Sequence, residues 1–418
     1  MTDAAPGVRL PKACAGGFRN TEKIVETAAR AALAAASLAP AAEAADVRMY
    51  GIIDTGIIVE NNRNGVNGTE CTAREEFGVN LGPRVGLVAN EDLGNGLKVK
   101  MQLESLFESD NGAMRFNRLF GGESSLAVIG RFGEFAAGRM GALTSPFGHW
   151  GMFGLEATPF GFGWGRAGGV HWMQGGDRLD NALSWASPEL AGGLTLYAQY
   201  SFQTGSNPVP GVEEADTEDN NRRAALGFKY RTPKVTFAGT VDRIMHPAPE
   251  TGASWSGARD STLASLAVNF LVADNVRLYV MGQMFRDFYT VPGTPVYMPV
   301  SLIGSNNLAD ENARGVSGRG FDGYVLGLNA KIGLWGGDLM LTSAYDDIEY
   351  KGHVKAGAET GLKRWLLGAA YEYPLSKRTH LYGAANWTHG SGLFDSDNFE
   401  DTSDPNSEQV MFGITHFF

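Results

Sequence analysis

Apolar and polar side chains alternate along most of this chain, and this period of two constrains the fold more than any other feature. The segment Leu97–Glu104 is the clearest case, because leucine, valine or methionine stands at each odd position and lysine, glutamine or glutamate at each even one. Similar runs recur at 194–202, 223–230 and 276–283. A period of two predicts strands with one apolar and one polar face, so the sequence predicts an all-β fold.

The last run of this kind reaches the end of the chain. Val410, Phe412 and Ile414 stand on one of its faces, mainly small or polar residues stand on the other, and Phe418 is the final residue. A soluble sheet rarely ends in a bare apolar strand, because an unpaired edge promotes aggregation. Pairing of the last strand with the first removes that edge, and we therefore expect a closed barrel.

The connections between the runs are alternately short and long. Short connections lie at 93–96, 131–133, 232–234, 273–275 and 374–376. Long connections rich in Gly, Asn, Asp and Pro lie near 61–80, 107–122, 141–177, 203–220, 246–260, 288–318, 350–361 and 390–407. Tight turns at one end and long loops at the other are typical of outer-membrane barrels, whereas a compact soluble domain rarely has so many long loops.

The segments between these breaks predict sixteen antiparallel transmembrane strands, with a margin of two. We expect them near 47–60, 82–92, 97–106, 124–131, 134–140, 178–188, 194–203, 221–231, 234–245, 261–272, 275–287, 320–332, 338–349, 362–373, 378–389 and 408–418. A barrel of this size encloses an aqueous channel. The polar face that carries Lys98 and Lys100 agrees with a water-filled lumen.

The first 45 residues differ from the rest and are expected to be a signal peptide or leader. Basic residues are spread over residues 9–30, an alanine-rich stretch follows at 31–40, and Ala42-Glu43-Ala44 has the pattern of a cleavage site. A disordered or helical alanine-rich tail is the alternative. Residues 46–418 are then the barrel, and no segment of them approaches the ~20 consecutive apolar residues of a membrane-spanning helix.

Charge and motifs argue against several classes of function. The net charge is −11 at pH 7, whereas nucleic-acid-binding proteins carry basic patches. Cys71 is the only cysteine outside the leader, so no disulfide forms within the mature chain. The sequence lacks P-loop, GxSxG, HExxH and paired CxxC motifs, and we expect no catalytic site, metal site or cofactor.

Several motifs, in their order and spacing, resemble the general porins of Gram-negative bacteria, above all the β-proteobacterial type. They are Val47–Asp54, Glu91–Lys98, Arg131–Glu134 and Tyr371–Thr379, together with Phe418 at the terminus. The resemblance spans residues 46–418. It implies a location in the outer membrane and a homotrimer of barrels, each with a long third loop folded into the lumen. The implied partners are outer-membrane lipid, lipopolysaccharide and the barrel assembly machinery, which would read Phe418 as an assembly signal.

The resemblance also implies a constriction in which basic side chains of the wall face the third loop. Low-dielectric walls focus such a field. Arg84 matches a wall arginine of the family, and Arg178 matches another because it stands three residues before Asn181. Both are expected to face Glu156, the only acid well inside the loop at 141–177. The alternative for each arginine is a solvent-exposed position on a strand.

Other members of the expected constriction match the family less well. Arg139 follows a glycine as in the family, but simple alternation places it on the apolar face, so a bulge is needed to turn it inward. Glu123 stands where the family usually has arginine, which weakens the basic side and predicts a weak cation preference. Lys98 and Lys100 complete the set.

Aromatic and acidic residues in the loops allow two interpretations each. The loop at 141–177 holds Phe147, Trp150, Phe153, Phe160, Phe162, Trp164 and Trp172. They either line the channel for solutes such as sugars or pin the loop against the wall. Acidic clusters at 213–219 and 395–404 are either solvated loops or sites for divalent cations shared with lipopolysaccharide. Aromatic residues near strand ends, Tyr50 and Tyr382 among them, are expected to form interfacial girdles.

The sequence therefore predicts a pore for the passive diffusion of small hydrophilic solutes and ions. A substrate-preferring channel, with the aromatic third loop as its selectivity element, is the alternative. An outer-membrane barrel enzyme or a surface adhesin with long loops is the prediction from a different class.

Overall fold

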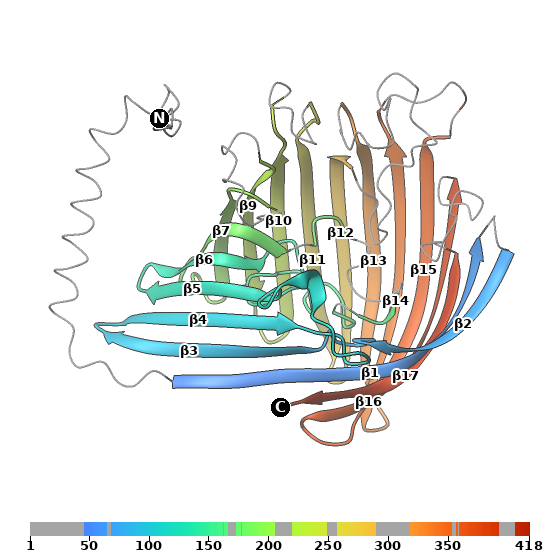
Figure 1. The fold of residues 1–418 in the computed structure, drawn as a ribbon, viewed down its shortest axis with the longest axis horizontal. Coiled ribbons are helices and arrows are strands. Elements are labelled where there is room, and N and C mark those ends of the chain that lie inside the picture. The colour runs from blue at the N-terminus through green and yellow to red at the C-terminus, as the bar shows by residue number, and fades with distance from the viewer. Residues whose placement is uncertain are drawn as a thin grey trace, which may run out of the picture.

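The computed structural model describes residues 46–64, 68–161, 163–165, 173–176, 178–204, 220–248, 257–289, 318–352, 357, 359–392 and 406–418, which form one antiparallel sheet closed into a barrel (Figure 1). The strands are β1 (Asp46–Asn64), β2 (Gly68–Phe77), β3 (Arg84–Gly94), β4 (Leu97–Leu106), β5 (Glu123–Gly130), β6 (Gly133–Gly141), β7 (Arg178–Ala186), β8 (Leu194–Ser201), β9 (Arg222–Arg231), β10 (Val235–Met245), β11 (Ser261–Ala273), β12 (Val276–Phe288), β13 (Phe321–Leu334), β14 (Gly337–Tyr350), β15 (Gly361–Pro374), β16 (Thr379–Gly392) and β17 (Ser407–Phe417). A short 3-10 turn, η1 (Arg115–Asn117), lies between β4 and β5. In the described ranges no helix is long and apolar enough to cross a membrane.

The barrel closes between its first and last strands, as the apolar C-terminal run predicts. β17 pairs with β1 from Ile52 opposite Phe417 to Asn62 opposite Ser407. The terminal residue extends this pairing, because the Phe418 amide donates to the Gly51 carbonyl at 3.0 Å and the Gly51 amide donates back at 3.1 Å. The Phe418 ring lies over Gly51, where a side chain would collide with it. Figure 1 shows the C-terminus beside β1.

The second strand of the barrel is broken into two parts. β2 pairs with the later part of β1, from Thr55 onward, and β3 pairs with its earlier part, up to Ile52. The seventeen strands of the described ranges therefore make sixteen strands around the barrel, the expected number. Residues 78–83 interrupt the second strand at mid-height.

The expectation of a long connection at 61–80 was wrong. β1 continues to Asn64 and β2 occupies most of the remaining segment. Cys71, Ala73 and Glu75 lie on one face of β2 and are exposed, and Arg74 and Glu76 lie on the other and bond to each other. Both faces are polar or small, so this strand lacks the alternation that identifies the others. The other strands agree with the prediction within a few residues.

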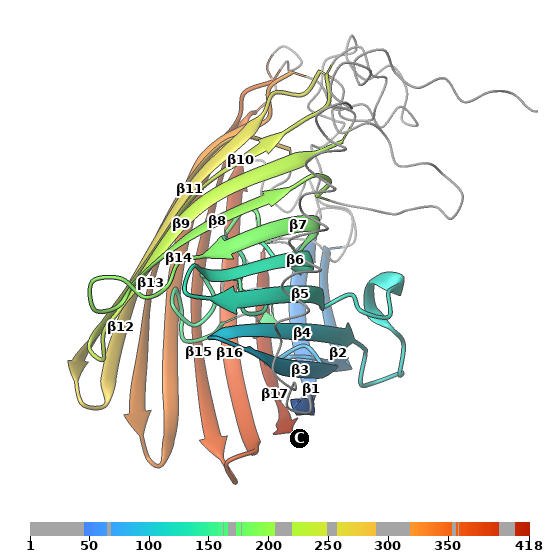
Figure 2. The same cartoon turned by 90° about the vertical axis from the view of Figure 1, so that its left-hand side faces the viewer.

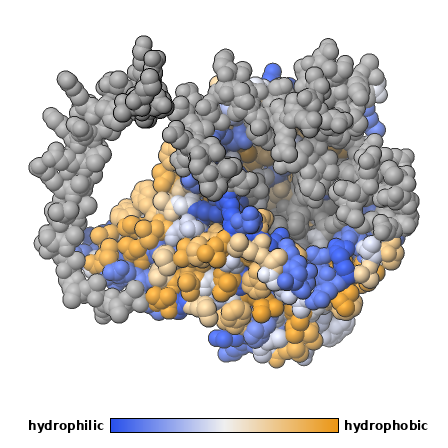
Figure 3. All heavy atoms as spheres, viewed as in Figure 1, coloured by the Kyte–Doolittle hydropathy of each residue, from blue (hydrophilic) through white to orange (hydrophobic). Residues whose placement is uncertain are grey.

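The two faces of the wall differ in character. Many outward side chains are apolar and exposed, among them Val85, Leu87, Leu126, Val128, Phe135, Leu226, Val241, Met284, Leu326 and Phe412. Figure 3 shows such residues over the face formed by β3–β6. Inward side chains such as Gln199, Ser265, Gln283 and Thr342 are polar and buried. Figure 2 shows the short β11–β12, β13–β14 and β15–β16 turns at one end of the wall.

Two of the aromatic residues expected in interfacial girdles face the inside of the barrel. Trp365, Tyr373 and Trp387 are exposed on the outer face. Tyr50 points inward, where its hydroxyl donates to Glu104 at 3.0 Å, and Tyr382 is buried inside the barrel. Aromatic residues near strand ends thus point either outward or inward, and their position along a strand alone does not predict which.

Candidate pore constriction

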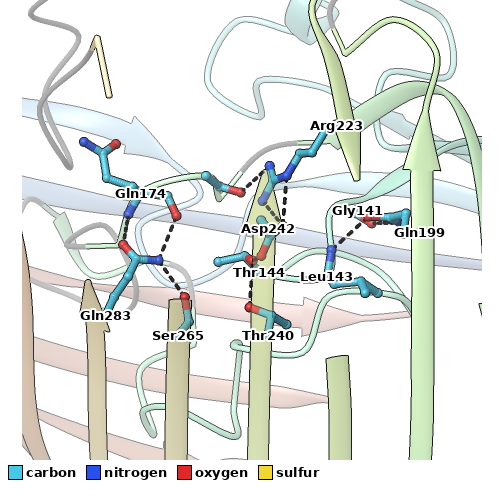
Figure 4. Close-up of polar contacts among 11 residues, drawn as sticks. Gly141, Leu143, Thr144, Gln174, Gln199, Arg223, Thr240, Asp242, Ser265 and Gln283 are labelled. Carbon is cyan, nitrogen blue, oxygen red and sulfur yellow. Dashed lines mark hydrogen bonds and ion pairs between the residues drawn. The ribbon is translucent and has the colours of Figure 1, made fainter. Parts of the chain in front are cut away.

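The connection from β6 to β7, residues 142–177, is named loop 3, and its first residues bond to inward side chains of β8 and β10 (Figure 4). The Leu143 amide donates to Gln199 Oε1 at 3.1 Å, and Gln199 donates back to the Gly141 carbonyl. The Thr144 hydroxyl donates to Asp242 Oδ2 at 2.6 Å. All of these groups are buried, so the hydrogen bonds compete with little water.

The returning end of loop 3 bonds to the neighbouring strands. Gln174 exchanges two hydrogen bonds with Gln283 of β12, and Arg223 of β9 donates to the Gly175 carbonyl at 3.0 Å. Arg223 also pairs with Asp242, at 2.6 Å between Nη2 and Oδ1. Arg223 and Asp242 are each 1% exposed. One buried ion pair therefore bonds to both ends of loop 3, through Thr144 and Gly175, as Figure 4 shows for its labelled members.

Apolar packing fills the space between loop 3 and this part of the wall. Trp150, Met152, Phe153 and Ala157 of the loop are at most 1% exposed. The wall side chains in the same cluster are mostly small, namely Ala127, Ala136, Ala182, Ala186, Ala225, Ala238 and Ala267. Alanine leaves room for the large loop residues, so the loop and the wall interlock without a wet gap.

Further along, loop 3 reaches the opposite side of the barrel. Asn269 donates to the Glu156 carbonyl at 2.9 Å, and Asn386 of β16 donates to the Trp164 carbonyl at 3.1 Å. Phe160 and Trp164 are buried against inward residues of β14–β17. The described loop aromatics are thus mostly buried, which agrees with the pinning interpretation. Phe162 and Trp172 lie outside the described residues, as do the acidic clusters at 213–219 and 395–404 and the leader at 1–45.

Arg84 and Arg178 come together on the wall, in a cluster with a third arginine. Arg84 Nη1 lies 3.6 Å from Glu104 Oε1, and Arg178 stacks on Phe147 of loop 3 at 4.0 Å. Arg178 lies within electrostatic range of Glu104, Arg84 and Arg115. Arg115, from the β4–β5 connection, flanks Gly82 together with Arg84. Burial, the largest cause, lowers the pKa of the Arg115 guanidinium, and the charge of Arg84 acts in the same direction.

Acidic groups line the wall beside this cluster. Glu123 is buried next to Ser125, whose hydroxyl donates to it at 2.8 Å. It lies directly opposite Glu104 in the register of β4 and β5. Lys100 is close enough to act on the charges of Glu123 and Glu134. His149 of loop 3 bonds to Glu134 at 2.9 Å. On this side, charged wall residues therefore contact Phe147 and His149 of the loop.

Glu156, which was expected to face Arg84 and Arg178, forms its ion pairs with other residues. Glu156 forms ion pairs with Lys229, at 3.0 Å, and with Arg231, both on β9. The sequence presented Glu156 as the only acid well inside the loop, but it contained no information on where along the wall that part of the loop would lie. The two arginines instead have Glu104 and the Phe147 ring as their neighbours.

The other expected members of the constriction have different surroundings. Lys98 is exposed beside the β3–β4 turn, 3.9 Å from Asp92, and so lies at the mouth of the barrel. The β6–β7 register is irregular between Gly138 and Met140, where a bulge was expected. Arg139 bonds there to Asp180 at 2.7 Å, and Asp180 also binds Arg118. Arg139 thus forms its ion pair with Asp180, although its charge also acts on Arg178.

Sequence reasoning missed two groups of residues. Arg115 and Arg118 lie in the β4–β5 connection, and only the closed fold brings them to the wall. Arg223 and Asp242 stand at inward positions of β9 and β10, where a paired arginine and aspartate on neighbouring strands was a usable signal. In the described ranges no group of three or more His, Cys, Asp or Glu residues is arranged to hold a metal ion.

A closed barrel with an apolar outer face, a polar inner face and a long connection bound to its inner wall defines a β-barrel channel of a membrane. A family model described as "Gram-negative porin" matches residues 28–393. An outer membrane porin protein of Bordetella pertussis is 29% identical over 415 residues, which cover 92% of this chain and 99% of that protein. The chain belongs to the Gram-negative porin family.

Solved structures agree with this assignment. The anion-selective porin from Comamonas acidovorans has a TM-score of 0.62 at 19% identity, with 90% of this chain and all of that chain covered. OmpF of Salmonella typhi has a TM-score of 0.56 at 14% identity, with 89% and 97% covered. The protein is accordingly a passive diffusion pore of the bacterial outer membrane.

Proposed function

We propose that solutes cross this barrel through a constriction between loop 3 and the wall that carries Arg84, Arg115 and Arg178. The observation that supports it most directly is the stacking of Arg178 on Phe147, because it joins the basic wall to the loop. The apolar packing of loop 3 on β5–β11 leaves no wet path on that side. Water and solutes therefore pass beside the charged wall.

We also propose that the protein works as a homotrimer without catalytic activity or cofactor. A solved structure of similar fold is described as the trimer form of OmpT of Vibrio cholerae. Residues 1–45 serve as the leader. The barrel sits among outer-membrane lipid and lipopolysaccharide, and the barrel assembly machinery reads Phe418. The burial of the described loop aromatics argues against a sugar-lined, substrate-preferring channel.

Reconstitution tests the pore directly. Liposomes that contain the purified protein should admit small neutral sugars at rates that fall with solute size, with no cofactor added. The same preparation should hydrolyse neither phospholipid nor peptide. Liposomes that stay tight while a hydrolytic turnover is measured would instead identify a barrel enzyme.

The charges around the constriction support a weak anion preference. Four arginines, at 84, 115, 139 and 178, lie within electrostatic range of one another, with Glu104 beside Arg84 and Arg178 and with Glu76 and Glu108 near Arg115. This balance opposes the weak cation preference expected from Glu123 alone. The sequence-based expectation considered the missing arginines near residue 120 but not Arg115.

Arg84→Ser should move the reversal potential in a salt gradient toward cations. A unit charge ~4 Å from a passing ion attracts an anion and repels a cation by about 1 kcal/mol each in water, so the anion-to-cation permeability ratio should fall about 30-fold. Arg286→Ser is the matched control, because Arg286 is exposed on the outer face of β12. An unchanged ratio in Arg84→Ser would exclude Arg84 from the constriction.

A further inference from the structure

The break in the second barrel strand lies where the far end of loop 3 meets the wall. Between Phe77 and Arg84 the chain leaves the sheet, and Val79 and Asn80 are buried at 2% and 6% exposure. Val79 belongs to the same inner apolar cluster as Phe160 and Trp164 of the loop. The bend at 78–83 is therefore turned toward the inside of the barrel, and we name it the inner bend.

The inner bend is built on one buried carboxylate. Asp54 of β1 has no exposed surface. Its carboxylate accepts hydrogen bonds from the main-chain N–H of Asn80 at 3.1 Å, from the Tyr382 hydroxyl at 3.0 Å and from the Thr415 hydroxyl. Its main-chain carbonyl accepts from the Gly78 amide at 3.0 Å. A buried carboxylate is costly unless it is fully hydrogen-bonded, and here the partners include the bend itself.

Loop 3 docks on this bend through its main chain. The Trp164 amide donates to the Val79 carbonyl, and Gly163 lies so close to the Asn80 carbonyl that any side chain there would collide with it. The Trp164 ring meets the ring of Tyr382 edge-on, with centroids 5.2 Å apart. The same tyrosine hydroxyl bonds to Asp54, so loop, strand and bend share one network.

The inner bend also orients Arg84, one of the arginines of the basic cluster. The Gly82 carbonyl accepts a hydrogen bond from Arg84 Nε at 2.9 Å. Ile53 and Asp54 of β1 have no partner in the broken second strand, whereas a continuous strand would pair with both. Such irregularities are over-represented next to functional sites, where they re-aim a side chain.

We propose that the inner bend, residues 78–83, is a dock that holds the tip of loop 3, and that Asp54 is the positioning residue that builds it. The dock holds the middle part of loop 3, which lies across the barrel from Arg223 and Asp242. Through the Gly82 carbonyl it also holds the side chain of Arg84. The width and the charge of the constriction are thereby set from one point. The proposal rests on the proposed function of loop 3 as the constriction.

The test compares Asp54→Ala, Trp164→Ala and the double variant by single-channel recording in planar bilayers. Asp54→Ala should raise the open-channel noise, and events of high conductance should be about tenfold more frequent, as expected from the loss of one well-satisfied buried acceptor. The reversal potential should move as well, because Arg84 loses its orienting bend. Asp54→Asn retains one acceptor oxygen and should restore part of the wild-type behaviour.

The double variant makes the test decisive. If Asp54 acts through the loop tip, the noise of the double variant should equal that of Trp164→Ala, since coupled residues are not additive. Full additivity, or wild-type noise in Asp54→Ala at normal heat stability, would overturn the dock. If Asp54→Ala fails to fold, Tyr382→Phe, which removes only the hydroxyl that donates to Asp54 and keeps the ring beside Trp164, should still raise the noise; no change there would also overturn the dock. Wild-type conductance reports on the proposed function independently.

Discussion

Replacement of Asp242 by alanine should release loop 3 at both of its ends. The substitution removes the acceptor of Thr144 and leaves Arg223 buried without its carboxylate. Loss of one partner of a buried pair costs about 3–5 kcal/mol, so the detached loop should become at least about 100-fold more populated. Single-channel recording should show frequent large-conductance events, and the cut-off for neutral sugars in liposome swelling should move to larger solutes.

Two further variants define what this result means. Thr144→Val keeps the ion pair and removes the two hydrogen bonds of the Thr144 hydroxyl, with Asp242 and with Thr240. Together they contribute about 2 kcal/mol, so the effect should be about 30-fold. Asp346→Ala breaks a comparable buried pair with Arg364, and the carboxylate of Asp346 bonds to no described residue of loop 3. It should lower heat stability without changing the channel noise. Equal noise in Asp242→Ala and Asp346→Ala would show that Asp242 supports the barrel and not the loop.

Deletion of Phe418 should reduce the amount of folded trimer in the outer membrane more than any other single change. The deletion removes the ring over Gly51 and the two terminal hydrogen bonds between Phe418 and β1. Two hydrogen bonds and a partly buried ring contribute roughly 2–4 kcal/mol to closure. Heat-modifiable mobility on gels and the yield in outer-membrane fractions are the measurements.

Gly51→Val separates closure from recognition by the assembly machinery. A side chain at position 51 pushes the Phe418 ring away but leaves the terminal residue in place. This variant should insert at a normal yield and melt at a lower temperature. If it loses as much yield as the deletion, then packing at the seam, and not a signal in the unfolded chain, explains both results.

The strands and their number could be predicted from the sequence because apolar outward residues and polar inward residues alternate within most of the strands. β4 shows this most clearly, since its even positions face the lumen and its odd positions face outward. β2 escaped prediction because both of its faces are polar or small. The inner bend escaped as well, since Gly78 and Pro83 look like the ends of an ordinary loop.

The candidate constriction was predictable only in part, and the reason is the distance along the chain between its members. Arg84 and Arg178 could be selected because each sits in a local motif. Their neighbours Arg115 and Phe147 come from loops that reach the wall only after the barrel closes. The partner of Glu156 was mistaken for the same reason, because a loop position does not reveal which of many strands it touches.

The alanine-lined part of the wall has a consequence for the electric field in the channel. Loop 3 and these alanines form a dry, weakly polarisable slab beside the water path, and Arg178 of β7 lies against this slab, stacked on Phe147. Salt ions cannot enter such a slab, so a charged side chain beside it has counter-ions on its water side only. The field of the arginines is therefore screened less than in a tube of water, where a Debye length of about 8 Å applies at 0.15 M salt. Discrimination between ions should persist at salt concentrations that suppress it in a wider pore.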